Sequence, residues 1–79
     1  MARAQRQFRR LARRAQLRVG MAIENLATHH RPAHAFPIVP EFQIFRMAVA
    51  RHRIIYRVDD LHEEISVMMI QEWPDLRRN

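Results

Sequence analysis

Apolar side chains recur every three or four positions along residues 2–31. The stripe comprises Ala4, Phe8, Leu11, Ala12, Ala15, Val19, Ala22, Ile23, Leu26 and Ala27. Arginines surround its first half, and Pro32 ends the pattern. This spacing is typical of an amphipathic helix, so we predict helical structure over residues 2–31.

A single helix over this range would be too long for so small a protein. At about 1.5 Å per residue it would extend on the order of 40 Å, more than one small core can cover. We therefore expect two antiparallel helices that join near residues 13–16. Neither glycine nor proline stands there, so the helical hairpin is inferred from size alone.

The pattern changes after Pro32. Residues 32–41 contain three prolines and no periodicity, which predicts an extended connector. Apolar stretches at residues 42–49, 52–58 and 65–72 predict three β-strands. Only Ala50 and Arg51 separate the first two, which indicates a tight hairpin. The expected fold class is α+β, a helical hairpin packed on a three-stranded antiparallel sheet spanning 42–72. We expect one domain over 1–79, with a basic tail at 73–79.

The middle strand has two different faces. In "RHRIIYRVDD", residues 51–60, the side chains of Arg53, Ile55 and Arg57 alternate with those of Ile54, Tyr56 and Val58. Successive side chains of a strand point to opposite faces. The face with Tyr56 is therefore predicted to be buried, and the other face to carry arginines.

The chain is small and strongly basic. It has 79 residues, no cysteine and a formal net charge of +6. A core of this size is marginal unless a partner covers part of it, and the charge favours nucleic acid, a ribosome or an acidic protein as that partner. All the basic residues are arginine, a bias that GC-rich coding also produces. No apolar run approaches a membrane span or a signal peptide, so we expect a cytoplasmic protein that does not bind membranes.

Histidines gather where the helical pattern ends. His29 and His30, with His34 nearby, offer at most a two-residue clip and no third ligand. We predict no metal site and no cofactor.

The stretch "FRMAVARHRIIYRVD", residues 45–59, carries a recognisable motif. It fits without a gap the family pattern of an aromatic residue, Arg, Leu, Arg, Val, Gly, any residue, Tyr, Arg, two β-branched residues, Tyr, Arg, Val and Asp. The helical half, "AQRQFRRLARRAQLRVGMAIENLATHHRP", stands in the same order as in that family. The chain thus resembles the RelE/ParE superfamily of type II toxin–antitoxin toxins.

The resemblance implies a bacterial toxin that a cognate antitoxin neutralises. Such toxins inhibit growth by acting on DNA gyrase, as ParE-like members do, or on ribosome-bound mRNA, as the RelE-like mRNA interferases do. A nuclease of this kind needs a base, an acid and cations around the reacting phosphate. Candidates here are Arg46, Arg53 and His52, but Ala48 stands where nuclease members carry an arginine. The catalytic set looks incomplete, and whether the chain is an enzyme stays open.

Two sets of binding residues are expected. The residues that would contact the target or nucleic acid are Arg46, Arg51, Arg53, Arg57, Arg77 and Arg78. The residues that would contact the antitoxin are Phe8, Leu11, Arg10 and Arg14.

Two departures from the family pattern leave an alternative open. The family begins with a strand, whereas here the helix starts almost at Met1, which suggests a truncated chain, a misplaced start or a strand supplied by a partner. Ala50 replaces the hairpin glycine, where a positive φ would cost roughly 1 kcal/mol, so a different turn is expected. The alternative function is a degenerate, non-toxic module that binds nucleic acid or protein.

Overall fold

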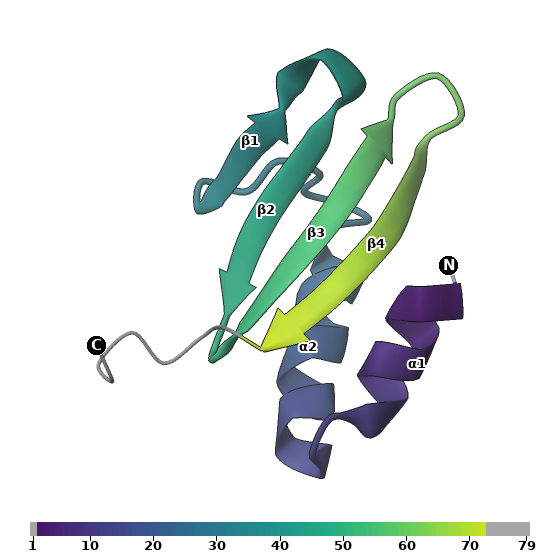
Figure 1. Ribbon diagram of the computed structural model, residues 1–79. Helices are drawn as coiled ribbons and strands as arrows, with labels where there is room; N and C mark the ends of the chain where they lie inside the picture. Colours follow the sequence, from purple (N-terminus) through teal and green to yellow (C-terminus); the bar gives the residue numbers. More distant parts are fainter. Residues whose placement is uncertain (1, 73–79) are drawn as a thin grey trace, which may run out of the picture.

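The computed structural model describes residues 2–72 as two helices, a short 3-10 turn and four strands (Figure 1). In chain order they are α1 (Ala2–Arg10), α2 (Arg13–Asn25), β1 (Ala35–Val39), η1 (Pro40–Phe42), β2 (Ile44–Val49), β3 (His52–Asp59) and β4 (Glu64–Glu72).

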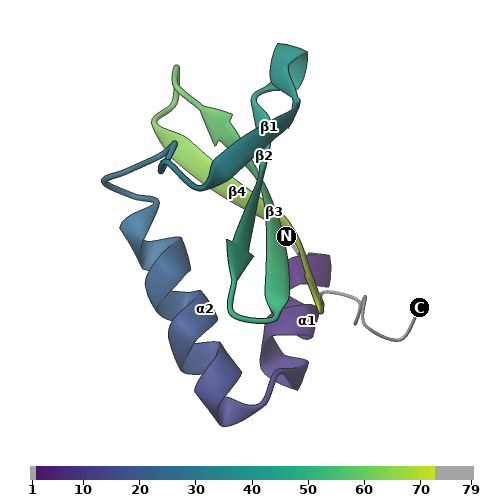
Figure 2. The ribbon, with the colours of Figure 1, turned by 90° about the vertical axis from the view of Figure 1, so that its left-hand side faces the viewer.

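The four strands form one antiparallel sheet in the order β1-β2-β3-β4. In Figure 1, α2 passes behind the sheet and α1 lies beside β4, while no described helix covers the front. Figure 2 shows the same arrangement from the side, with the two helices joined by a short turn. The predicted α+β fold, a helical hairpin packed on an antiparallel sheet, is confirmed. We call the side of the sheet away from the helices the open face.

The sheet has four strands rather than the predicted three. The additional strand, β1, lies within residues 32–41, which we predicted to be a connector. Phe36 of β1 pairs with Arg46 of β2, and Pro37 pairs with Phe45. Proline is tolerated because β1 is an edge strand with one unpaired side. The prolines of this segment favoured a connector over a strand in the sequence pattern. The pairing of β1 with β2 becomes apparent only in the folded sheet.

The break between the helices comes at Leu11 and Ala12, slightly before the predicted position. The side chain of Gln16 stabilises it, because Nε2 donates hydrogen bonds to the carbonyl oxygens of Phe8, at 3.0 Å, and Arg9, at 3.2 Å. Carbonyl groups at the end of a helix lack intrahelical partners. A side chain of α2 thus stabilises the turn between the helices, where neither glycine nor proline is present.

The second helix is shorter than predicted. It ends at Asn25, and the chain turns where the amides of Thr28 and His29 both donate to the Asn25 carbonyl oxygen. The histidines expected in a last helical turn therefore lie in the connection to β1.

The core lies between α2 and the covered face of the sheet. Its buried members are Val19, Leu26, Phe45, Met47, Ile54, Tyr56, Val58 and Ile70. On β3 the alternation is as predicted, since Ile54, Tyr56 and Val58 are at most 2% exposed whereas the intervening side chains belong to the open face. The pattern of β3 alone thus determines which side of the sheet the helices cover.

The outer edge of β4 is protected by α1. The side chain of Gln7 accepts a hydrogen bond through Oε1 from the backbone N–H of Ile70, at 2.7 Å. An unpaired strand edge is a template for unwanted association. The contact with α1 satisfies one of these edge groups and fixes the first helix against the sheet.

Ala50, in the β2–β3 turn, adopts the left-handed backbone conformation that favours glycine. Ala50 has a φ of 55°, so the different turn that we expected is not found. We predict that Ala50→Gly raises the free energy of unfolding by about 0.5–1 kcal/mol, because glycine removes the Cβ strain at positive φ. Urea unfolding measures the effect. Ala48→Gly, at a strand position without positive φ, should instead lower stability, and equal effects of the two changes would contradict the strain.

Candidate target-binding face

One row of side chains crosses the open face from edge to edge. Phe36 of β1 stands opposite Arg46 of β2, Arg46 opposite Ile55 of β3, and Ile55 opposite Met69 of β4. These four residues, the central row, have side chains on the same face because directly opposite residues of paired strands share a face. The row combines an aromatic ring, a guanidinium group and two apolar side chains.

Two further arginines flank the central row. Arg53 and Arg57 lie on β3, two residues before and two residues after Ile55. At about 3.3 Å per residue they stand roughly 13 Å apart, and Arg46 lies on the neighbouring strand midway between them. We call Arg46, Arg53 and Arg57 the arginine triplet. A guanidinium group presents a planar fork that suits phosphate or carboxylate oxygens, and the open face carries three such groups.

Phe36 and Arg46 form a cation–π pair at one side of this face. The Arg46 guanidinium carbon lies 5.7 Å from the centroid of the Phe36 ring, within the range of a cation–π interaction. The Phe36 side chain is nevertheless 60% exposed. An aromatic side chain this open to solvent, on a sheet with its own core elsewhere, is available for contact with another molecule.

The groups that could supply acid–base chemistry are placed elsewhere. Tyr56 is buried, and its hydroxyl donates to the His30 carbonyl oxygen at 2.9 Å. His52 has the parity of the covered face, since it alternates with Arg53 on β3. His62 lies in the β3–β4 loop and binds Asp59. Tyr56 and His52 therefore belong to the opposite face from the arginine triplet, whereas His62 binds Asp59, which shares the face of Arg57 on β3 and is within reach of its charge.

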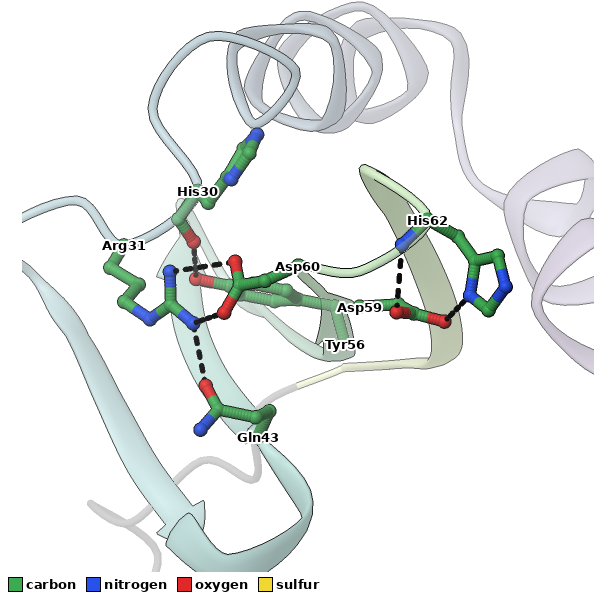
Figure 3. A network of polar contacts seen from close by, with 7 residues as sticks. All are labelled: His30, Arg31, Gln43, Tyr56, Asp59, Asp60 and His62. Atoms are coloured by element: carbon green, nitrogen blue, oxygen red, sulfur yellow. Dashed lines mark hydrogen bonds and ion pairs between the residues drawn. The ribbon is translucent and has the colours of Figure 1, made fainter.

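A second polar cluster ties the connector to the β3–β4 loop (Figure 3). The Arg31 guanidinium group donates to Asp60 at 2.9 Å and to the Gln43 side-chain oxygen at 2.6 Å. It also lies 5.4 Å from the centroid of the Phe45 ring, which in turn stacks on Tyr56 with ring centroids 5.6 Å apart. Arg31 thus links the segment after α2 to the sheet, a role that sequence reasoning did not foresee.

Asp59 and His62 form a clip within the β3–β4 loop. Asp59 accepts hydrogen bonds from the His62 backbone N–H, at 3.1 Å, and interacts with His62 Nδ1 at 2.8 Å. Hydrogen bonding to Asp59 and its negative charge raise the pKa of His62, and the same hydrogen bonds lower the pKa of Asp59. The clip therefore stabilises the loop most when Asp59 is ionised and His62 is protonated.

This clip predicts a pH-dependent stability. A raised folded-state pKa means that the His62 contribution is fully present below its unfolded pKa of about 6.5 and is lost as pH rises through the folded value. The lowered pKa of Asp59 means that its contribution is lost only in acid. His62→Asn should flatten the decrease in Tm between pH 6 and 8. His34→Asn, an exposed histidine in the connector, should leave that decrease unchanged, and a flattening there instead would contradict the assignment.

The remaining predicted residues for target binding are dispersed. Arg51 is exposed in the β2–β3 turn, at one end of the open face. Arg77 and Arg78 lie outside the described residues, as does the whole predicted basic tail at 73–79. Phe36 was missed by sequence reasoning. Phe36 and Ile38 stand two residues apart, the spacing of one face of a strand, but the prolines outweighed this signal.

The predicted antitoxin-binding residues divide between the core and the surface. Phe8 and Leu11 are half-buried and pack against the core, whereas Arg10 and Arg14 are exposed. A pocket of about 590 Å³ opens between the two helices and β4. Phe8 lines it together with Ile23 of α2 and residues of β4, so Phe8 is accessible from that side.

Neither a cluster of metal ligands nor a membrane-spanning helix is found among the described residues. Within residues 2–72, no three His, Asp or Glu side chains come together as metal ligands. None of the helices in the same range is long and apolar enough to cross a membrane.

The fold and the open face define a small α+β protein with a helical hairpin behind an arginine-bearing sheet. Residues 1–71 match the family model of the ParE toxin of the type II toxin–antitoxin system parDE. The chain therefore belongs to the ParE toxin family, and the predicted resemblance to the RelE/ParE superfamily is confirmed. It is a type II toxin, whose family implies a cognate antitoxin as partner. No curated protein and no solved structure matches it.

Proposed function

We propose that this toxin inhibits growth by binding DNA gyrase through its open face and not by cleaving ribosome-bound mRNA. The observation that carries the proposal is the arginine triplet, Arg46, Arg53 and Arg57, while Tyr56 and His52 lie away from it on the covered face. RNA cleavage needs a positioned base and acid in addition to cations. Inhibition by binding requires only shape and charge, both of which the open face provides.

The gyrase proposal also gives a role to each candidate site residue. Arg46 and Arg53 act as anion contacts and not as catalytic groups, and His52 has no catalytic role because it has the parity of the covered face. Arg51, at the end of the face, extends the contact. The toxin acts in the cytoplasm, where gyrase and its DNA are found.

We further propose that the antitoxin neutralises the toxin from the side of α1. Phe8 is accessible through the pocket between the helices and β4, and the exposed Arg10 and Arg14 add positive charge nearby. Leu11 completes the apolar part of this surface. An antitoxin segment with apolar and acidic side chains would be complementary to it.

The experiment that tests the gyrase proposal combines growth and enzyme assays. After induction in a bacterial host, DNA synthesis should fall before bulk translation does, and the purified protein should inhibit supercoiling by gyrase. Loss of translation first, with cleaved mRNA, would assign the chain to ribosome-dependent nucleases. Unchanged growth despite abundant folded protein would favour the degenerate binding module.

Matched arginine variants connect this activity to the open face. Arg57→Gln removes an exposed member of the triplet and should reduce inhibition of supercoiling about tenfold. Arg18→Gln removes an exposed arginine from α2, which lies behind the sheet, and has the same effect on net charge. Equal loss in both variants would show that only the overall charge matters.

A further inference from the structure

We propose that two copies of the toxin form a weak dimer through the outer side of α2. The two helices lie antiparallel, with Leu17 of each copy against Met21 of the other. At both ends of this contact, Arg14 of one copy pairs with Glu24 of the other. The contact lies on the side of α2 away from the sheet, so it leaves both open faces accessible. The inference goes beyond the proposed target contact and does not depend on it.

The residues of this contact, the outer stripe, lie along one side of α2. Arg14, Leu17, Met21 and Glu24 follow one another at intervals of three, four and three residues. At about 3.6 residues per turn they fall within roughly 80° of the helix circumference. Val19, which is completely buried, points in the opposite direction. The outer stripe therefore faces away from the core. In Figure 2, α2 forms one margin of the molecule, with the sheet and α1 on its other side.

The apolar centre of the outer stripe is open to solvent. Leu17 is 60% exposed and Met21 is 63% exposed. Residues four apart on a helix are neighbours on its surface, so the two side chains form one apolar patch. Alternating intervals of three and four residues are also the spacing with which one helix packs along another. A second helix laid along the outer stripe would bury both side chains.

The charges of the outer stripe are complementary to those of a second copy. Arg14 and Glu24 are both exposed, and neither forms an ion pair with another residue in the range 2–72. The two stand at equal distances in sequence from Val19, and so do Leu17 and Met21. A two-fold axis at the level of Val19 therefore places Arg14 opposite Glu24 of the second copy. The same axis places Leu17 opposite Met21.

Glu24 favours a second copy over an acidic helix of another protein. It is the first acidic residue of the chain and follows seven arginines. An acidic helix would gain from Arg14 but would bring its own carboxylates against Glu24, and like charges across an interface are unfavourable. In the dimer, the same carboxylate meets a guanidinium group at each end of the contact.

The size of the outer stripe limits the strength of the dimer. A stable interface takes about 20–30 residues from each partner, and the outer stripe supplies far fewer. We therefore expect a Kd in the range of about 10 µM to 1 mM. Arg14 also belongs to the surface proposed for the antitoxin, so antitoxin binding and dimerisation compete for this side chain.

Sedimentation equilibrium of the full chain at about 10 µM to 1 mM tests the proposal. Glu24→Arg and Arg14→Glu each place like charges opposite one another at both ends of the contact, and each should weaken the dimer at least about tenfold. Both changes in one chain restore opposite charges and should return the Kd to within about threefold of the wild-type value. A mixture of the two single variants should also associate, because one copy then carries only arginines and the other only glutamates at these positions.

Two controls separate this contact from other modes of association. Glu41→Arg makes the same change in net charge in η1 and should leave the Kd unchanged. Leu17→Gln should weaken the dimer about tenfold, whereas Leu61→Gln, at a residue that is 86% exposed in the β3–β4 loop, should not. Circular dichroism checks that each variant is folded. A monomer at every concentration would overturn the proposal. So would equal effects of Glu24→Arg and Glu41→Arg, or a double charge exchange that does not restore the dimer.

Discussion

Ile54→Ala is expected to lower the free energy of unfolding by about 3 kcal/mol, the middle of the range for removal of a buried isoleucine side chain. Ile54 is completely buried among residues of the sheet and α2. Truncation leaves a cavity that the surrounding side chains cannot fill without moving. In a domain of this size, 1 kcal/mol corresponds to about 4–8 °C in Tm, so a decrease of more than 10 °C is expected.

Ile55→Ala is the matched control for this prediction. The two isoleucines are adjacent on β3 and lose the same atoms, but Ile55 lies on the open face and is only half-buried. Its truncation should cost less than about 1 kcal/mol, in line with a surface position. Thermal and urea unfolding of both variants measure the difference. If the two changes had similar effects, the helices would not cover the face that contains Ile54.

Tyr56→Phe is expected to cost about 1–2 kcal/mol, although only one oxygen atom is removed. The Tyr56 hydroxyl donates to the His30 carbonyl oxygen in a partly buried position. Its loss leaves that carbonyl group without this donor, and an unsatisfied buried polar group costs about 1–3 kcal/mol. The bond joins β3 to the segment after α2, so hydrogen exchange in that segment should also become faster.

An exposed hydroxyl provides the control for Tyr56→Phe. Thr28 donates through Oγ1 to the Asn25 carbonyl oxygen at the surface, and Thr28→Val should change stability by less than about 0.5 kcal/mol. The pH profile gives a second measure. Burial raises the pKa of Tyr56, while the positive charge of Arg31 acts in the opposite direction. The Tyr56 contribution is therefore present below about pH 10 and is lost as pH rises through the folded value. The Phe variant should lack that loss.

The sequence predicted only those residues of the candidate site whose face follows from the alternation of side chains along one strand. The positions of Arg53 and Arg57 on one face of β3 followed from the period of two. Phe36 did not follow, because a proline on each side of its stretch favours a connector over a strand. Its place beside Arg46 depends on the register between β1 and β2, which no local pattern encodes.

For the helical hairpin, too, the sequence predicted one part of the structure and not the other. Its existence followed from the length of the apolar stripe, but the position of the break did not. Gln16 stabilises the break by donating to Phe8 and Arg9, and a glutamine has no special preference for turns. The contact of Gln7 with the edge of β4 is likewise a pairing between residues far apart in the chain.

By itself the sequence determined the α+β class, the arginine-bearing face of β3, the buried face that contains Ile54 and Tyr56, and the family resemblance. These properties depend on the period of side chains along one element, which is local. Only the tertiary structure decided that the sheet has four strands, that Phe36 joins Arg46 on the open face, and that Arg31 binds Asp60. Those contacts join segments far apart in sequence. They form when the sheet folds and brings the segments together, and the local pattern of one segment does not predict its contact with the other.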